Sequence, residues 1–517
     1  MSQEDLHRDA PHAGQHESEL VKVRREKLDR LTERGIEAYR PRYGEPGGLA
    51  YSDDLATAHE KLEPGAGSGL TASVAGRLMA RREHGKATFA DLQDSHGRIQ
   101  LLLRQDALGS GEYGEFSELD LGDWVGATGE VIRSRRGELS IAVESFELLS
   151  KSLRPLPEKW HGLKDREQRY RQRYLDLVMN EEARDVLQAR ATLIRAIRDF
   201  MDGKGFMEVE TPMLHVMPGG ATARPFVTHH NALGMDLYLR IAPELYLKRL
   251  LVAGYDKVYE LNRNFRNEGI STRHNPEFTM LEAYQAFVDY RYMMVLLQEM
   301  IVCAVEAVRG SRDVLHAGRV ISLEPPWKEV TMVDALAEYA DLEVDISMGV
   351  DRLMKIADER EVEVPSGAGA GWVIAELYEK LVEPLLVEPT FVLDYPEEIS
   401  PLARRKPDSP GFTERFEILI GGQEIANAFS ELADPTDQRS RFEAQAARRA
   451  AGDEEAHPVD EDYLTALEYG MPPAGGLGVG IDRLTMLATG CQNIRDVITF
   501  PHLRPAGGRS AAPGVEY

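Results

Sequence analysis

Residues 258–284 read VYELNRNFRNEGISTRHNPEFTMLEAY, and the organisation of the larger part of the chain follows from them. Polar and apolar residues alternate over 258–266 and again over 277–284, which is the period of a β-strand. The residues between the two runs, 267–275, are polar and basic. The stretch therefore predicts two antiparallel strands joined by a long solvated loop.

Charged and aromatic side chains share one face of these predicted strands, because every second side chain of a strand points the same way. Phe278, Glu282 and Tyr284 lie on one face of the second strand, and Arg266 ends one face of the first. This mixture is typical of a binding site, although a half-exposed hairpin with ordinary surface ion pairs shows the same pattern.

The length and composition of the chain exclude several classes of protein. A chain of 517 residues predicts two or three domains. The net charge of −25 argues against a general nucleic-acid coat protein but allows a local basic patch. No apolar segment approaches a membrane span, two cysteines form no disulfide framework, and the polar N-terminus is no secretory signal. We therefore expect a cytoplasmic protein with no membrane partner.

Residues 1–69 are predicted to form an N-terminal extension. Residues 1–17 are polar and are expected to be disordered. A helix rich in Lys and Arg is predicted from a Ser18 cap to Arg34, and its basic side chains indicate either a solvated face or a contact with an RNA backbone. Residues 41–69 carry scattered Gly and Pro and are interpreted as a linker.

Residues 70–150 contain short strands separated by turn signals. The predicted strands are Thr71–Leu78, Ala87–Leu92, Ile99–Leu103, Trp124–Val131 and Leu139–Leu148. Five strands in about 80 residues suit a closed barrel such as an OB-fold, which commonly binds single-stranded nucleic acid by stacking bases on aromatic rings. Arg77, Phe89 and Gln100 lie on adjacent predicted strands and are candidates for that contact, although a lone Phe is also an ordinary core residue.

Residues 151–173 are a basic connector, which indicates either a contact with nucleic-acid phosphates or a solvated linker. The second domain is expected over 174–504, beginning with a helix at Glu181–Asp202 and a short strand at Phe206–Thr211. A tail rich in Gly, Ala and Pro follows at 505–517.

Gly421 and Gly422 stand between two apolar runs, which predicts a two-residue hairpin. The hairpin would place Glu417 and Glu424 on one face, where two carboxylates repel each other unless a cation lies between them. Magnesium with a triphosphate suits such a pair, and two exposed acids on a strand edge are the alternative.

Further along the second strand of this hairpin, Asn427, Phe429 and Glu431 share a face that regular alternation would turn away from Glu424. A β-bulge near Ala426 is therefore needed if all four are to line one pocket.

Three segments together resemble the class II aminoacyl-tRNA synthetases, and most closely the lysyl-tRNA synthetases. FRNEG at 265–269 and RHNPEF at 273–278 resemble motif two of that family, and GGLGVGIDRL at 475–484 resembles motif three. The predicted helix and strand before Pro212 resemble motif one, which implies a homodimer. The resemblance covers nearly the whole chain. It implies an α+β fold, with an N-terminal OB-fold β-barrel for the anticodon and a class II catalytic domain built on an antiparallel sheet flanked by helices.

The resemblance also implies roles for individual residues. Arg266 and Arg483 are the implied catalytic residues. The implied ATP-binding residues are Arg266, Glu268, His274, Phe278, Glu417, Glu424 and Arg483; Phe278 and Arg483 would enclose the adenine, and Glu417 and Glu424 would hold Mg²⁺. The implied lysine-binding residues are Gly220, Glu244, Arg266, Glu282, Tyr284, Asn427, Phe429, Glu431 and Gly478. The implied anticodon-binding residues are Arg77, Phe89 and Gln100.

The implied reaction is the ATP-dependent activation of L-lysine to lysyl-adenylate and its transfer to the 3′ end of tRNA(Lys), releasing AMP and pyrophosphate. A cleft rich in Glu favours an amino acid with a cationic end over aspartate, and a buried Glu431 left unpaired by a neutral analogue would cost about 3–5 kcal/mol. The alternatives are a paralogue that transfers lysine to a protein, a non-catalytic RNA-binding relative, and an aspartyl- or asparaginyl-type enzyme.

Overall fold

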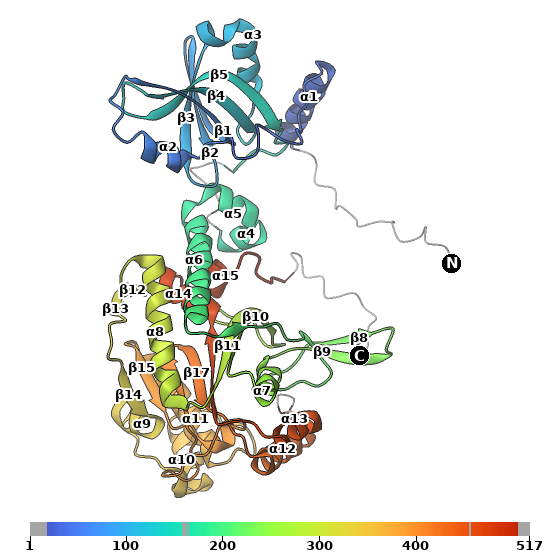
Figure 1. Ribbon diagram of the computed structural model, residues 1–517, viewed down its shortest axis with the longest axis vertical. Coiled ribbons are helices and arrows are strands. Elements are labelled where there is room, and N and C mark those ends of the chain that lie inside the picture. Colours follow the sequence, from blue (N-terminus) through green and yellow to red (C-terminus); the bar gives the residue numbers. More distant parts are fainter. Residues whose placement is uncertain (1–17, 158–162, 164, 454–455, 457, 505–517) are drawn as a thin grey trace. The chain divides into compact units, whose positions relative to one another are not determined.

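The computed structural model describes residues 18–157, 163, 165–453, 456 and 458–504 (Figure 1). The chain divides into two compact units, Met1–Gly162 and Leu163–Tyr517, and each is treated by itself below. The expectations for residues 1–17 and 505–517 lie outside the described residues.

The first unit is built on a closed five-stranded barrel with strand order β1-β2-β3-β5-β4. Its strands are β1 (Gly67–His84), β2 (Ala87–Gln93), β3 (Arg98–Arg104), β4 (Trp124–Arg133) and β5 (Leu139–Ser150). All five predicted strands are confirmed. Inward-facing apolar residues such as Leu78, Leu101 and Ile141 are fully buried and fill the barrel.

Within the described residues of this unit, three helices accompany the barrel. The predicted N-terminal helix is confirmed as α1 (Glu19–Glu33), and the Ser18 side chain caps it. The expected linker contains α2 (Ser52–Ala58), and a third helix, α3 (Gln105–Glu118), was not predicted. The sequence of α3 gives little helical signal because three glycines interrupt it and it buries few side chains.

The basic residues of α1 divide between the barrel and the solvent. Arg24 is buried and donates hydrogen bonds to the backbone carbonyls of Leu121, Ser152 and Arg154, and Lys27 pairs with Asp120. Other basic residues of the helix, such as Lys22 and Arg30, are exposed. At most part of this helix is therefore available to an RNA backbone.

The second unit is organised around an eight-stranded sheet with the order β14-β15-β16-β17-β18-β11-β10-β6. In that order the strands are Lys328–Thr331, Thr390–Leu393, Arg415–Leu419, Glu424–Ser430, Ala474–Gly480, Glu277–Ala286, Lys257–Phe265 and Met207–Glu208. The two edge pairs, β14–β15 and β10–β6, are parallel, and every other pair is antiparallel. The two strands predicted within 258–284 are β10 and β11, which lie side by side between β18 and the edge strand β6.

Helices cover one face of the sheet and form the main core. Helices α6 (Glu181–Gly203), α8 (Tyr290–Arg309) and α14 (Ile481–Thr489) bury Ile197, Leu297 and Leu484 against it. The predicted helix at Glu181–Asp202 is confirmed. Other helices of the unit are α4 (Arg166–Arg171), α5 (Arg173–Met179), α7 (Glu244–Val252), α9 (Met332–Ala340), α10 (Val350–Glu359), α11 (Ala370–Leu381), α12 (Pro435–Ala450), α13 (Glu461–Glu468) and α15 (Ile494–Val497). The opposite face of the sheet is left for the site described below.

Two smaller sheets complete the unit. Strands β12 (Asp313–His316) and β13 (Arg319–Ser322) form a hairpin. Strands β7 (Leu214–His215), β9 (Met235–Leu239) and β8 (Val227–His230) form a three-stranded sheet, and Figure 1 shows β8 and β9 as an arm that extends from the main sheet.

The strand predicted at Phe206–Thr211 is shorter than expected and comprises only β6. Beyond it, the backbone N–H of Thr211 donates to the carboxylate of Glu260 rather than to a backbone carbonyl of β10. The ladder therefore ends where a buried side chain replaces the neighbouring strand as the acceptor.

The basic stretch 151–173 is used largely for internal contacts where it is described. Lys151 is buried between Asp120 and Asp123 of the first unit. Arg173 is buried and donates to the carbonyls of Arg495, Ile498 and Thr499 in the second unit, which begins at Leu163.

None of the helices within the described residues combines the length and the apolar character that a membrane span needs.

Candidate active site

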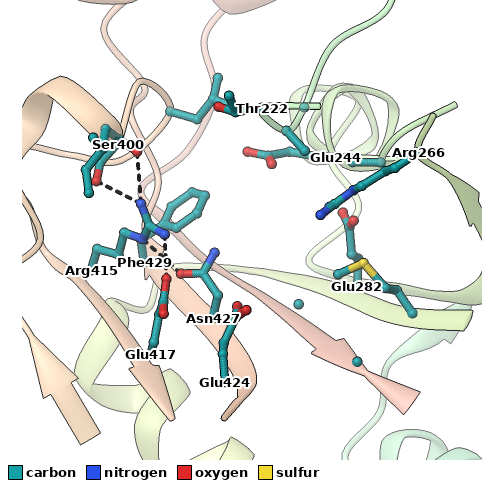
Figure 2. A pocket seen from close by; sticks show the side chains of 18 of the residues that line it. Thr222, Glu244, Arg266, Glu282, Ser400, Arg415, Glu417, Glu424, Asn427 and Phe429 are labelled. Carbon is teal, nitrogen blue, oxygen red and sulfur yellow. Dashed lines mark hydrogen bonds and ion pairs between the residues drawn. The ribbon is translucent and has the colours of Figure 1, made fainter. Parts of the chain in front are cut away.

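A cavity of about 470 Å³ lies on the face of the main sheet that is opposite the core helices. Many of the residues that line it come from β11, β16, β17 and β18, from the loop after β10, and from the start of α7, and others come from α11, α12, the start of α14 and the loops 218–222 and 395–403. Figure 2 shows Arg266, Glu244 and Glu282 on one side of this space and Arg415, Glu417 and Asn427 on the other.

The β16–β17 hairpin supplies one wall. The backbone N–H of Ile420 donates to the carbonyl of Gln423 at 3.1 Å, and both Gly421 and Gly422 have φ near +70° (68° and 69°), as the predicted two-residue turn requires. Leu419 is opposite Glu424, which confirms the predicted register.

A β-bulge follows this turn. Ile418 pairs with Ala426 whereas Leu419 pairs with Glu424, so Ile425 is an extra residue in β17. The bulge brings Glu424, Asn427 and Phe429 to the same cavity. The predicted bulge near Ala426 is thus confirmed, and its extra residue is Ile425.

Glu417 and Glu424 both line the cavity, and each accepts a hydrogen bond from an arginine. Arg415 donates to Glu417 at 2.7 Å, and Arg483 donates to Glu424 at 2.9 Å. Burial and the neighbouring charge of Glu424 raise the pKa of Glu417 to about 7. Two facing carboxylates on rigid strands suit a Mg²⁺ ion that takes its remaining oxygens from phosphate and water. Among the described residues, no cluster of three potential ligands forms a complete metal cage.

A third acid near this pair was missed by the sequence analysis. Glu383 lies in a 3₁₀ turn (Glu383–Leu385) that lines the cavity. Its pKa is raised to about 8 by burial and by the charges of Glu417 and Glu424. The turn is distant in sequence from the hairpin, so no local pattern connects Glu383 with these acids.

The predicted nucleotide-binding residues are brought together in this cavity. Arg266, Glu268, His274, Phe278 and Arg483 all line it. The guanidinium of Arg266 lies 5.1 Å from the ring centre of Phe278, and Arg483 lies 3.2 Å from Nε2 of His274. Nε of Arg266 is buried without a hydrogen-bond acceptor among the described residues, which leaves one donor for a ligand.

Most of the predicted lysine-binding residues line the same cavity. They are Gly220, Glu244, Arg266, Glu282, Tyr284, Asn427, Phe429 and Gly478. Tyr284 donates to Glu282 at 3.1 Å, and burial together with the charge of Glu244 raises the pKa of Glu282 to about 8. Asn427 accepts a hydrogen bond from Arg415 at 3.0 Å.

The structure corrects the expectation for Glu431. This residue does not belong to the cavity lining; its side chain is fully buried, and Oε2 lies 2.5 Å from Nζ of Lys248. Glu431 therefore has an internal counter-ion in Lys248, so a neutral analogue of lysine would not leave this carboxylate unpaired, as the sequence analysis assumed. Lys248 was missed because its position in α7 reads as an ordinary helical residue.

Gly476 explains how Glu431 and Tyr284 come so close to β18. A Cβ at this position would overlap Oε1 of Glu431 and the Tyr284 ring, so only glycine fits. Gly476 lines the cavity, whereas the sequence analysis singled out only Gly478 from this run.

The predicted anticodon residues share one outer face of the barrel. Arg77 of β1 is paired with Gln93 of β2, and Gln100 of β3 is paired with Asp91 of β2. Phe89, Asp91 and Gln93 are alternate residues of β2 and therefore share a face, and Arg77 and Gln100 lie on the same face as their partners. Arg77 stacks over Trp124, which is partly exposed, at 4.9 Å. Trp124 was not singled out from the sequence, although its position opposite Arg77 on β4 adds an aromatic ring to the same face.

Comparisons with known proteins agree with this architecture. Residues 165–504 match the family model described as tRNA synthetases class II (D, K and N), and residues 72–149 match the OB-fold nucleic acid binding domain. The chain is 56% identical to a lysine–tRNA ligase of Moorella thermoacetica over 95% of this chain and 98% of the relative. It is 48% identical to the lysine–tRNA ligase of Bacillus subtilis over 98% of this chain and the whole of the relative. The chain therefore belongs to the class II tRNA synthetases, within the lysyl-tRNA synthetase family.

Proposed function

We propose that this protein activates L-lysine with ATP and transfers the lysyl group to the 3′ end of tRNA(Lys). The observation that carries the proposal is that two arginines, Arg266 and Arg483, two carboxylates, Glu417 and Glu424, and an acidic, tyrosine-containing set of side chains all line one cavity. The first groups are suited to a magnesium-bound triphosphate, and the acidic set is suited to an amino acid that carries two ammonium groups.

In the first step, a carboxylate oxygen of lysine attacks the α-phosphorus of ATP, and pyrophosphate leaves with the electrons of the broken P–O bond. Arg266 lines this cavity and is the residue proposed to hold both the lysine carboxylate and the α-phosphate. His274 is proposed to contact the outer phosphates, and Arg483, which lies 3.2 Å from Nε2 of His274, is proposed to enclose the adenine with Phe278. Such a reaction depends on positioning and charge neutralisation rather than on a protein nucleophile.

Glu417 and Glu424 are proposed to hold Mg²⁺. When bound, the ion would neutralise phosphate charge that the two carboxylates alone would repel. Removal of Mg²⁺ with a chelator is expected to abolish activation, and Glu424→Gln is expected to require at least about tenfold more Mg²⁺ for half-maximal rate.

In the second step, a terminal ribose hydroxyl of tRNA attacks the lysyl carbonyl carbon, and AMP leaves. We infer that the barrel contributes tRNA selection through Arg77, Phe89 and Gln100, since these lie on one face. The expected setting of this reaction is the cytoplasm, where tRNA is charged.

We further infer a homodimer. Apolar side chains are exposed around β6–β9, namely Met207, Leu214, Val216, Met217, Val227 and Leu233. Such a group of exposed apolar residues is typical of an interface. Sedimentation equilibrium should give twice the chain mass, and Val216→Asp should lower the association.

One pair of assays tests the proposed function against its alternatives. Lysine-dependent exchange of pyrophosphate into ATP, followed by charging of purified tRNA, is the expected result. Exchange without tRNA charging would favour lysyl transfer to a protein, and exchange driven by aspartate or asparagine would favour those amino acids. The absence of exchange would favour a non-catalytic relative.

A further inference from the structure

Lys248 is a buried ammonium group that contacts Glu244, one of the residues lining the proposed amino-acid site. Its side chain is completely buried in α7, and Nζ lies 2.6 Å from Oε1 of Glu244 and 2.5 Å from Oε2 of Glu431. A buried lysine is stable as a cation only when carboxylates compensate the loss of water. Burial lowers the pKa of Lys248, but the two carboxylates outweigh burial and the pKa is raised above its usual value.

The two carboxylates that Lys248 joins come from different elements of the fold. Glu244 is the first residue of α7 and lines the cavity, whereas Glu431 follows β17. Phe429, which also lines the cavity, presents its ring 5.5 Å from Nζ. Lys248 therefore connects a helix with the end of a strand next to the cavity wall.

Each carboxylate keeps one oxygen that Lys248 does not occupy. Oε1 of Glu431 lies against Gly476, a cavity-lining residue, and has no hydrogen-bond donor within the described part of the chain. A buried carboxylate oxygen without a donor is costly unless a ligand supplies one.

We propose that Lys248 is a positioning residue of the lysine site: its ammonium group holds Glu244 and Glu431 in place, and the oxygens it leaves free receive the ammonium groups of the substrate. The inference rests on the proposed function and identifies which group prepares the pocket for a dicationic amino acid. Without Lys248, two buried carboxylates would face each other and would take up protons instead of a ligand.

The surrounding charges bear on the pH dependence of this arrangement. The titratable and charged groups that act on Lys248, Glu244 and Glu431 are Glu282, Tyr284, Arg415 and Tyr463. Burial raises the pKa of Glu431 to about 8, and Lys248 opposes that rise. Loss of Lys248 should therefore move the ionisation of the pocket to higher pH.

The test compares the wild-type protein with Lys248→Met by lysine-dependent pyrophosphate exchange from about pH 6 to about pH 9. The KM for lysine near neutral pH should rise at least about tenfold, because one partner of a buried ion pair has been removed. The KM for ATP should change by less than about twofold. The rise in the lysine KM should become smaller as pH increases.

Lys151→Met is the matched control. Lys151 is equally buried and lies 2.6 Å from Asp120 and 2.9 Å from Asp123, but it belongs to the first unit. The Lys151→Met variant should have a lower melting temperature than the wild type, but its KM for lysine and the pH dependence of that KM should be unchanged. A shift of the lysine KM in Lys151→Met as large as in Lys248→Met would show a general structural effect and would overturn the proposal.

An unchanged lysine KM and pH profile in folded Lys248→Met would also overturn it. Lys248→Gln, whose amide can donate without charge, is judged by the same criteria if Lys248→Met does not fold. A wild-type structure with lysine bound provides an independent measurement: Nζ of Lys248 must stay paired with both carboxylates, and its displacement would contradict the proposal. Absence of exchange in the wild-type protein would instead contradict the proposed function.

Discussion

Arg483 donates through Nη1 to both the carboxylate and the backbone carbonyl of Glu424, each at 2.9 Å. One guanidinium at the start of α14 thus fixes an acid of the β16–β17 hairpin while its other nitrogen faces His274. The contact joins the glycine-rich strand β18, which leads into α14, with the carboxylates that are proposed to hold the metal.

Arg483→Met should reduce pyrophosphate exchange by about 10²–10³-fold, because it removes a fixed donor from a site where phosphate charge develops. The melting temperature should change little, since Arg483 is not part of the main core. Steady-state exchange and thermal melts measure the two effects. Arg312→Met, which removes an exposed arginine paired with Glu306 and Glu324, is the control and should keep full activity.

Glu282 should make the stability of the ligand-free protein depend on pH. Burial and the charge of Glu244 raise its pKa from 4.5 to about 8. Because the folded protein holds this proton more tightly than the unfolded chain, the stabilisation is complete below pH 4.5 and is lost as pH rises through about 8. Glu282→Gln carries no such proton, so its melting temperature should fall less over this range.

Lysine binding should follow the same ionisation. The ammonium groups of lysine favour the charged form of Glu282, so the increase in melting temperature caused by lysine should be larger at about pH 9 than at about pH 6, since these values lie on either side of the raised pKa of about 8. Equal increases at both pH values, or the same pH dependence in Glu282→Gln, would contradict this assignment.

Gly476→Ala should raise the KM for lysine by at least about tenfold, because the added methyl group overlaps Oε1 of Glu431 and the Tyr284 ring. Gly111→Ala is the matched control, because no atom lies within 4 Å of a Cβ added at this position. Gly111 lies in helix α3, where alanine is favoured over glycine, so this variant should be more stable than the wild type by up to about 1 kcal/mol. Kinetics and thermal melts of both variants distinguish the two outcomes. A lysine KM in Gly476→Ala equal to that of the wild type would show that this contact is not needed.

Phe89→Ala should weaken tRNA charging and leave lysine activation unchanged. Stacking of one base on an aromatic ring contributes about 1–3 kcal/mol, so the KM for tRNA should rise by about 5- to 150-fold. Pyrophosphate exchange without tRNA serves as the internal control. Trp124→Ala tests the additional ring on the same face, and equal charging by both variants and the wild type would argue against this face as the anticodon site.

Much of the fold follows from local patterns in the sequence. The barrel strands alternate apolar and polar residues, and the turn at Gly421–Gly422 fixes its own register, so both could be predicted. Helix α3 could not, because its three glycines and scarce buried residues give almost no helical period. The short β14 and β15 were missed within 285–400 for a similar reason: four-residue strands are too brief to show alternation.

The site was predicted less completely than the fold. Arg266, Phe278 and Arg483 lie in segments with a recognisable order of residues, and they do meet in one cavity. Glu383 and Lys248 were missed because their importance depends on neighbours that are more than thirty residues away in sequence or on another element. A buried ion pair leaves no periodic signal, so only the tertiary structure reveals that Glu431 already has a partner.

The extra residue at Ile425 has a consequence for how this wall can change. Deletion of this one residue would remove the bulge, but Asn427 and Phe429 would keep the parity of Glu424, so the same side chains would still line the cavity. Regular pairing at the present length would instead turn Ala426 and Ala428 toward the ligand and would turn the Asn427 amide and the Phe429 ring into the apolar core behind the sheet. A single irregularity in strand pairing thus decides which side chains this wall offers to a ligand.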